Sequence, residues 1–238
     1  MANQDLATIW VYLSASPLLE LTITLVVYNL AYRLHVYASY HPFLNPVITS
    51  VAILISFLLL TGTSYETYFE GGQFLHVLLG PATVALAIPL YQQVSKLRRL
   101  FLPMMLAITA GIIINTFSVV FIAQLLGASV QTQLSLAPKS VTAPVAMGIS
   151  EQIGGLPTLT AAMVVLTGIL GALLGPKLLQ LMRFQDQTIK GIAMGVSAHG
   201  IGTARALQIS IEMGAFSGLA MALSALASAV LVPWILRP

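Results

Sequence analysis

Cysteine is absent from this 238-residue sequence, and charged residues are scarce. The absence of cysteine excludes disulfide bonds, thiolate metal sites and cysteine nucleophiles. Only 7% of the residues are charged and 58% are apolar, whereas soluble domains carry about 25% charged residues. Seven acidic and ten basic residues cannot cover the surface of a soluble protein of this length. Most of the surface must therefore face hydrocarbon.

Other absences narrow the range of functions. The basic residues stand singly or at the ends of apolar stretches, so a net charge of +3 does not predict a nucleic-acid patch. The first ten residues, MANQDLATIW, contain an acid and no base. They lack the basic region of a signal peptide, and we expect the first hydrophobic helix to remain in the mature protein. Without a nucleotide fingerprint, a metal-ligand motif or a nucleophile triad, we expect no cofactor, no metal and no enzymatic activity.

Long apolar stretches alternate with short polar segments, which predicts an all-α integral membrane protein. A helix needs about 20 apolar residues to cross a bilayer. We expect one transmembrane domain over residues 1–238, with about seven or eight segments in the cell membrane. Six spans are predicted near residues 17–38, 44–62, 72–91, 98–126, 157–181 and 214–236. Segments 130–154 and 187–210 are long enough to cross but contain charges and helix breakers, so we expect broken or re-entrant helices there.

The positions of the charges predict the orientation. Basic residues cluster in two loops, which we place in the cytoplasm: Lys96, Arg98, Arg99, Arg183 and Lys190. Glu66 and Glu70 lie in a loop without bases, which we place outside. The chain is then outside after residue 126 and inside by residue 183, so segments 130–154 and 157–181 together must cross the membrane an odd number of times. We therefore expect 130–154 to enter the membrane without fully crossing it.

Similar strings occur twice in the same order. PVIT at 46–49 and PTLT at 157–160 each open a span, and GPAT at 80–83 and GIGT at 200–203 each interrupt the next segment. The loops between the paired strings fall on opposite sides by the charge rule, as an inverted repeat requires. The halves would be about 17–126 and 130–236. The alternative is chance similarity, which arises easily in an apolar chain.

The first candidate site is the string PKSVTAP at 138–144, followed by Glu151. A lysine at the centre of a spanning helix costs about 2.5–3.5 kcal/mol, so Lys139 needs a partner or a water-filled cavity. The two prolines free backbone groups, which at membrane depth must line a cavity or be buried in protein. Lys139 with the hydroxyls of Ser140 and Thr142 suits an anionic oxygen ligand. The alternative is an extramembrane loop in which Lys139 and Glu151 face water.

The second candidate site is the string SAHGIGTAR at 197–205. Gly200 and Gly202 are expected to break the segment, so that a half-helix points its amides and positive dipole end at the break. Thr203 adds a hydroxyl, and Arg205 offers a fork suited to a carboxylate. His199 titrates near physiological pH and could couple transport to protons, as could Glu151. The alternatives are a structural hydrogen bond for His199 and a structural pair of Arg205 with Glu212 or Glu151.

Two weaker features complete the predicted site. Pro81 and Thr83 belong to the uncharged GPAT string, which is either a second broken helix facing the first or a proline kink in an ordinary span. Asn115 more often joins helices than binds a substrate. Three glycines on the span 157–181 predict close helix packing, with a homodimer face as one interpretation: Gly168, Gly171 and Gly175.

The same strings resemble the LrgB/CidB family. The matching stretches are LNPVITSVAILI (44–55), GPATVALAIPLY (80–91), LAPKSVTAPVAMGISEQIGG (136–155), AHGIGTARAL (198–207) and GAFSGLAMAL (214–223). The resemblance implies a bacterial inner-membrane protein of about eight segments. It also implies two competing functions. In the first, family members act with a small LrgA/CidA-type membrane partner as antiholin-like regulators of murein hydrolases and autolysis. In the second, they transport small monocarboxylates such as pyruvate. A plastid glycolate/glycerate transporter contains a similar domain.

From the broken helices and their buried charges, we expect a secondary transporter of small monocarboxylates that uses alternating access and is coupled to protons. The substrate carboxylate would bind at the broken-helix termini, near Lys139 or Arg205. The alternative hypothesis is the antiholin-like regulator, which needs only an interaction surface and leaves the buried charges unexplained. An intramembrane enzyme is less favoured, because the sequence offers neither paired catalytic aspartates nor metal-ligand spacing.

Overall fold

The computed structural model describes residues 17–38, 44–78, 81, 84–85, 87–92 and 94–236. These residues form helices and their connections, and none of them forms a strand. The chain divides into two compact units, Met1–Ala85 and Leu86–Pro238, which are described separately. The treatment of the chain as one domain with two repeat halves stays a prediction.

The first unit contains α2 (Pro17–Tyr37), α3 (Pro46–Thr61) and α4 (Tyr65–Val77). Helix α2 packs against both α3 and α4, and the hydroxyls of Thr24 and Tyr68 lie 2.8 Å apart between α2 and α4. The sequence sets both ends of α3. The side chain of Asn45 accepts a hydrogen bond from the amide of Val47 at 2.9 Å, and Gly62 ends the helix at φ 68°, a conformation that glycine adopts without steric cost.

The predicted span 72–91 is not one continuous helix. Helix α4 ends at Val77, and α6 (Ala87–Gln92) begins ten residues later. Leu78, directly after α4, is in a turn, and most of the residues between the two helices lie outside the described residues. Pro81 is exposed, whereas Gly80 and Thr83 lie outside the described residues. The expectation of about seven or eight membrane segments stays a prediction.

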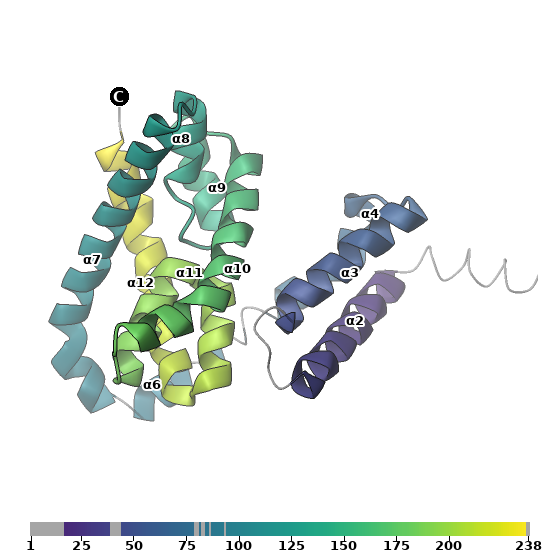
Figure 1. Ribbon diagram of the computed structural model, residues 1–238, viewed down its shortest axis with the longest axis horizontal. Coiled ribbons are helices and arrows are strands. Elements are labelled where there is room, and N and C mark those ends of the chain that lie inside the picture. The colour runs from purple at the N-terminus through teal and green to yellow at the C-terminus, as the bar shows by residue number, and fades with distance from the viewer. Residues whose placement is uncertain are drawn as a thin grey trace, which may run out of the picture. The chain divides into compact units, whose positions relative to one another are not determined.

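Three helices of the second unit are long and apolar enough to cross a bilayer: α7 (Val94–Leu125), α10 (Pro157–Leu181) and α12 (Ile211–Ile235). They confirm the spans predicted at 98–126, 157–181 and 214–236. Helix α12 packs against α7, and α11 (Gln187–Ile209) packs against both α10 and α12 (Figure 1). The chain is therefore an all-helical protein with several membrane-spanning helices.

Segment 130–154 forms a hairpin of two short helices, α8 (Val130–Leu136) and α9 (Ala143–Gln152). Residues 137–142 between them are not helical. At the start of α10, Thr160 Oγ1 lies 2.8 Å from the carbonyl oxygen of Ser135 and 2.7 Å from Ser150 Oγ. Because both arms of the hairpin meet the same residue, residues 137–142 form its tip. This first hairpin shows the interruption that the prolines predict.

Helix α11 is also folded back on itself, and its reversal lies at Ala198 (φ −131°, ψ 15°) and His199 (φ 39°, ψ −133°). Residues on either side of the reversal meet the same turn of α12. Thr203 Oγ1 lies 2.9 Å from Ser217 Oγ, and a side chain at Gly195 would collide with the carbonyl oxygen of Ser217. Residues 187–209 therefore form a second hairpin rather than one straight rod.

The break in this second hairpin differs from the prediction. The sequence suggests Gly200 or Gly202, but His199 adopts the positive φ. Its ring holds the turn in place, because Nε2 lies 2.9 Å from the carbonyl oxygen of Val164 on α10. Gly202 instead packs closely against Met194 and Ala198. A buried side-chain anchor thus outweighs the conformational freedom of the neighbouring glycines.

The glycines of α10 serve packing inside the chain. Side chains at Gly168, Gly171 and Gly175 would meet His199, Ala198 and Met194, all on α11. The predicted close packing is confirmed. The interpretation of this stripe as a homodimer face is wrong, because the second hairpin covers it.

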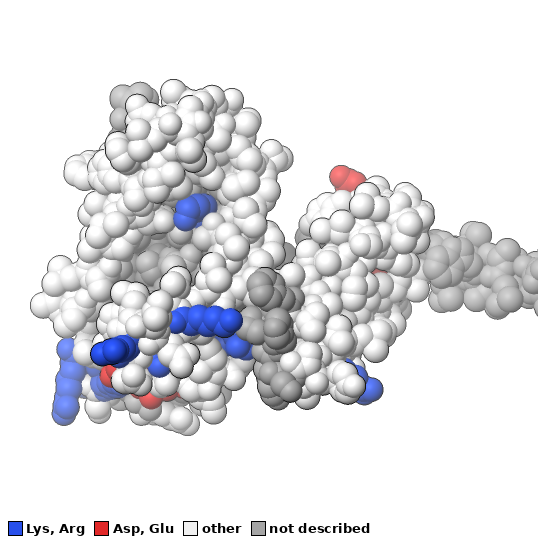
Figure 2. Space-filling model, in the orientation of Figure 1, with Lys and Arg blue, Asp and Glu red and all other residues white. Residues whose placement is uncertain are grey.

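Charged residues connect three segments at one end of the second unit. Lys96 Nζ lies 2.7 Å from Glu212 Oε1 and 3.4 Å from the Asp186 carboxylate. The start of α7, the loop before α11 and the start of α12 therefore lie at the same end. Figure 2 shows basic side chains gathered at this end of the unit. This agrees with the prediction that the two basic loops lie on one side of the membrane.

Candidate functional site

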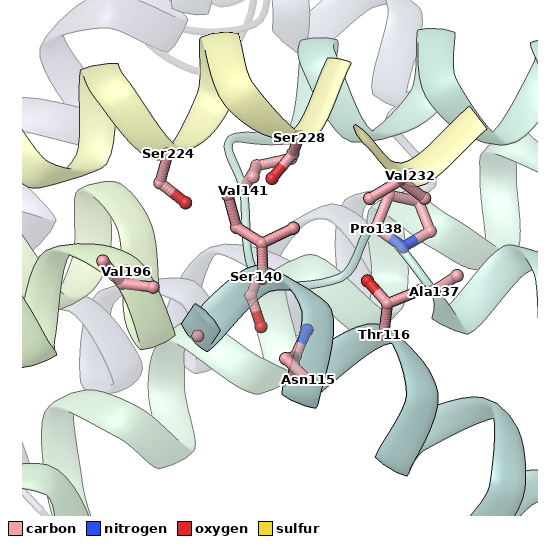
Figure 3. Close-up of a pocket in the computed structure, with 12 residues that line it drawn as sticks. Asn115, Thr116, Ala137, Pro138, Ser140, Val141, Val196, Ser224, Ser228 and Val232 are labelled. Carbon is pink, nitrogen blue, oxygen red and sulfur yellow. The ribbon is translucent and has the colours of Figure 1, made fainter. Parts of the chain in front are cut away.

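The two hairpins enter the second unit from opposite ends of α7. The first follows the end of α7 at Leu125, and the second begins beside Asp186, which pairs with Lys96 at the start of α7. A cavity lies where the tip of the first hairpin meets the second hairpin (Figure 3). Its lining comes from α7, α11, α12 and the tip: Gly111, Ile112, Asn115, Thr116, Ala137, Pro138, Ser140, Val141, Val196, Ser224, Ser228 and Val232.

The cavity is small and partly polar. Its volume is about 20 Å³, and a water molecule needs at least about 10–15 Å³ measured in the same way. The space thus fits roughly one water-sized group in this conformation. A whole organic acid of two or three carbons requires that the hairpin tip and the surrounding helices move apart.

Lys139 lies beside this cavity and has only neutral hydrogen-bond partners. Its Nζ lies 3.2 Å from Asn115 Oδ1 and 3.4 Å from Ser140 Oγ, and both partners line the cavity. Among the described residues, no carboxylate oxygen lies within 4.0 Å of this ammonium. The predicted Lys139 and Ser140 therefore come together, and they place an amine without a carboxylate partner among the described residues at the tip of the first hairpin.

Two hydroxyls in the cavity wall lack a hydrogen-bond partner among the described residues. Thr116 on α7 is 1% exposed and Ser224 on α12 is 2% exposed, and the hydroxyl oxygen of each is unsatisfied. Figure 3 shows the two hydroxyls on opposite sides of Val141, that of Ser224 on α12 and that of Thr116 on α7. A buried polar group without a partner costs about 1–3 kcal/mol. The fold keeps two such groups in one cavity.

The predicted residues of the second hairpin do not line this cavity. His199 is buried against Val164, as the structural alternative expects, and Thr203 Oγ1 donates to the carbonyl oxygen of His199 at 2.8 Å. Gly200 is exposed and Gly202 is buried. These groups hold the reversal of the chain together. Val196, two residues before the reversal, is the described residue of this hairpin that lines the cavity.

The other predicted residues lie apart from the cavity lining. Arg205 Nη1 donates to Gln208 Oε1 at 3.0 Å. Its proposed pairing with Glu212 or Glu151 is absent among the described residues, because Glu212 binds Lys96 and Thr188. Glu151 is exposed near the end of α9. Thr142 precedes α9 as its N-cap without a side-chain capping bond.

Sequence reasoning missed Thr116, Ser224 and Ser228, and it assigned Asn115 to helix packing. The serines are four residues apart on α12, and Ser217 lies seven residues, about two turns, before Ser224. This spacing puts small hydroxyl residues on one face of an apolar helix. Such a polar stripe could have indicated a buried site, although serines in membrane helices also serve ordinary packing.

Outside the membrane-spanning helices, Asp186 carries a shifted pKa. Partial burial acts to raise the pKa of its carboxyl, but the amides of Thr188 and Ile189 and the charge of Lys96 outweigh burial and lower the pKa below its usual value. The amide bonds to Asp186 Oδ1 are 2.7 and 3.3 Å long. Asp186 is thus both the N-cap of α11 and a partner of α7.

The chain belongs to the LrgB-like family, whose model matches residues 24–237. This matched region contains both hairpins and the cavity between them. With three helices able to span a bilayer, the chain is a multi-pass protein of the cell membrane. No solved structure matches it.

Several curated proteins are similar over most of their length. "Holin-like protein CidB" of Staphylococcus epidermidis RP62A is 35% identical over 93% of this chain and 96% of its own. "Holin-like protein CidB" of Staphylococcus aureus Mu50 is 36% identical over 91% of this chain and 94% of its own. YwbG of Bacillus subtilis 168 is 38% identical over 81% of this chain and 85% of its own.

Proposed function

We propose that this protein is a holin-like membrane protein that regulates murein hydrolase activity and autolysis in an antiholin-like way. The observation that supports this proposal is similarity over more than nine-tenths of the chain to relatives named holin-like. These names favour the regulator over the transporter. The proposal includes a small LrgA/CidA-type membrane partner and no enzymatic activity of the chain itself.

The test is deletion of the gene in its host, followed by measurement of autolysis and of murein hydrolase activity on gels that contain cell walls. We expect deletion to change both, and the wild-type gene to restore them. Co-purification from membranes then tests for the small partner. Unchanged autolysis and hydrolase activity in the deletion strain would count against the regulator.

A second candidate function is transport of a small monocarboxylate such as pyruvate, glycolate, glycerate or lactate. The observation that favours it is the meeting of two broken-helix hairpins, from opposite ends, at a cavity beside Lys139. Carriers place broken helices near mid-membrane, because the freed backbone groups and helix ends can bind the cargo there. The ammonium of Lys139 would bind the substrate carboxylate, with Ser140 as a hydroxyl donor.

Alternating access in this proposal depends on movement of the hairpins. Since the cavity holds only about one water-sized group, the tip of the first hairpin must withdraw from α7 and α12 to admit a whole acid. His199 and Glu151 are the proposed coupling groups. Arg205 would have to exchange its hydrogen bond with Gln208 for one with the substrate. A homodimer would have to use a face other than the glycine stripe of α10.

Uptake of labelled pyruvate, glycolate and lactate into proteoliposomes tests the transporter, with and without a pH gradient. We expect saturable uptake that is lost in Lys139→Ala. Lys177→Ala is the matched control, because Lys177 is an exposed lysine on α10 and its removal leaves the cavity intact. If the wild-type protein takes up none of the three acids, the transporter is excluded and the regulator remains as the proposed function.

A further inference from the structure

We propose that the first unit contains a binding pocket for a small organic ammonium ion, formed by the carboxylate of Glu20 and by hydroxyl side chains where α2, α3 and α4 meet. The pocket has a volume of about 380 Å³, and small-molecule sites usually have volumes of about 300–1,000 Å³. This inference is independent of regulation and of monocarboxylate transport, because it concerns a different unit of the chain and a ligand of opposite charge.

Glu20 supplies the first reason. It lies in the first turn of α2 and is 8% exposed, and it lines the pocket. Its carboxylate has neither a hydrogen bond nor an ion pair with any described residue. Burying a charged group without a partner is costly, and ionisable residues inside membrane segments commonly mark binding sites. Glu20 is therefore placed to bind a cation that comes from outside the chain.

The charges around Glu20 supply the second reason. Residues 1–85 contain a single lysine or arginine, Arg33. It lies thirteen residues further along α2, at a distance of about 20 Å along the helix axis. The start of α2 and the end of α3 lie at the same end of the unit (Figure 1), so the opposite partial charges of these helix ends offset each other. The negative charge of Glu20 therefore determines which ligands the pocket attracts.

Hydroxyl groups supply the third reason. Five of the lining residues carry one: Thr61, Thr63, Ser64, Thr67 and Tyr68. Some of them are already paired, such as Ser64 Oγ with Thr67 Oγ1 at 3.1 Å. A hydroxyl oxygen has two lone pairs and one proton, so a pair of hydroxyls can still accept a further hydrogen bond. An ammonium with several N–H donors can use the carboxylate and these oxygens together.

The rest of the lining favours an organic cation over a metal ion. It is largely apolar, and its side chains are Leu19, Ile23, Phe57 and Leu58. The described part of the chain contains no group of three or more histidine or acidic residues that could hold a metal. A short alkyl group can pack on the apolar wall while its ammonium binds Glu20. Because the charge rule places the loop after α3 outside the cell, the ligand would enter from outside.

Binding can be measured by titration calorimetry with the full-length protein in detergent at neutral pH. Butylammonium chloride is titrated into the protein at constant ionic strength, and tetramethylammonium chloride is titrated in parallel. Tetramethylammonium has the same charge but no N–H donor. We expect saturable binding of butylammonium, and binding of tetramethylammonium that is weaker by about tenfold or more, because hydrogen bonds to charged groups are the strong ones.

Three variants locate the ligand. Glu20→Gln keeps the shape of the side chain and removes its charge, and we expect the Kd for butylammonium to rise about tenfold or more. Glu66→Gln is the matched control, because it removes an exposed carboxylate from the first turn of α4 and should leave the Kd unchanged. If Glu20→Gln does not fold, Thr67→Val is titrated in its place, and loss of this one hydroxyl should raise the Kd about threefold to tenfold.

The results that would overturn the proposal are distinct. Absence of saturable butylammonium binding to the wild-type protein would mean that the pocket holds no ammonium ligand. An unchanged Kd in Glu20→Gln, or an equal rise in Glu66→Gln, would place the cation elsewhere. Equal affinity for tetramethylammonium would exclude recognition through N–H donors. Autolysis and uptake of organic acids are scored separately, so failure of either proposed function does not imply failure of this one.

Discussion

His199 carries the backbone reversal of the second hairpin, and Gly168 on α10 provides the space for its ring. A Cβ at position 168 would lie 2.7 Å from His199 Cε1 and 2.8 Å from Nε2. The ring cannot retreat without giving up its 2.9 Å hydrogen bond to Val164. The glycine is therefore a condition for the unusual conformation of the histidine.

We predict that Gly168→Ala destabilises the protein by about 1–3 kcal/mol, the usual cost of an overpacked core. Gly175→Ala is the matched control on the same face, since its Cβ would meet the flexible end of Met194, which can move aside. Thermal unfolding in detergent should show the larger drop for Gly168→Ala. Equal melting temperatures for the two variants would argue against a fixed His199 ring.

Asp186 contributes stability through its ionised form. Because its folded-state pKa is lowered, this contribution is complete above the unfolded pKa of about 4 and is lost as the pH falls through the folded pKa. Its amide bonds suggest that Asp186→Ala costs about 1 kcal/mol at neutral pH, as for other N-caps. Asp186→Asn keeps the cap and loses only the charge.

The difference in melting temperature between wild type and Asp186→Ala should be measured at pH 6 and at pH 3. We expect the difference in melting temperature to shrink at pH 3, because this pH lies below the unfolded pKa of about 4, where the contribution of the ionised carboxyl is being lost. At pH 6, we expect the melting temperature of Asp186→Asn to lie between those of the wild type and Asp186→Ala. A difference that is the same at both pH values would mean that ionisation of Asp186 has no part in stability.

At the scale of elements, Thr160 holds the first hairpin closed. Its hydroxyl lies within hydrogen-bond distance of Ser135 on α8 and Ser150 on α9. A side chain at Gly155 would collide with this same junction. The position of the tip that carries Lys139 therefore depends on the contacts that both arms of the hairpin make with the start of α10.

We predict that Thr160→Val destabilises the protein by about 1–3 kcal/mol, because it leaves buried partners unpaired. Thr158→Val is the control, since Thr158 is exposed two residues earlier on the same helix. The comparison is again thermal unfolding, with limited proteolysis to show whether residues 137–142 are cleaved more readily. If both valine variants behave alike, the junction does not hold the hairpin.

The two hairpins also show how far sequence reasoning reaches. The interruption at 137–142 could be predicted, because Pro138 and Pro144 exclude a regular helix. The reversal at His199 could not be placed, because it depends on an anchor supplied by Val164, 35 residues earlier. Thr116 and Ser224 were not predicted, since small hydroxyl residues in membrane helices usually serve ordinary packing, and only the packing of α7 against α12 brings these two to the lining of one cavity.

At the scale of the whole molecule, the arrangement of helices in the second unit determines which of its loops lie on the same side of the membrane. Helix α7 separates Lys96 from Leu125, and the ion pairs of Lys96 put the loop at 183–186 at the start of α7. Both hairpins return to the end from which they enter. The sequence alone predicted that the two basic loops lie on one side of the membrane. The rule that cytoplasmic loops are rich in lysine and arginine does not depend on packing.

We predict that single cysteines replacing Ser95 and Gln185 are labelled from one side of the membrane, and a cysteine replacing Gln131 from the other. All three positions are exposed, and the natural chain has no cysteine, so each variant carries one thiol. A membrane-impermeant maleimide applied to intact cells should react with Gln131→Cys, while Ser95→Cys and Gln185→Cys react only after the cells are opened, as the cytoplasmic placement of the basic loops requires. The reverse pattern would invert the orientation but keep the fold. Labelling of Ser95→Cys and Gln185→Cys from opposite sides would contradict the fold itself, because the Lys96–Asp186 pair could not then exist.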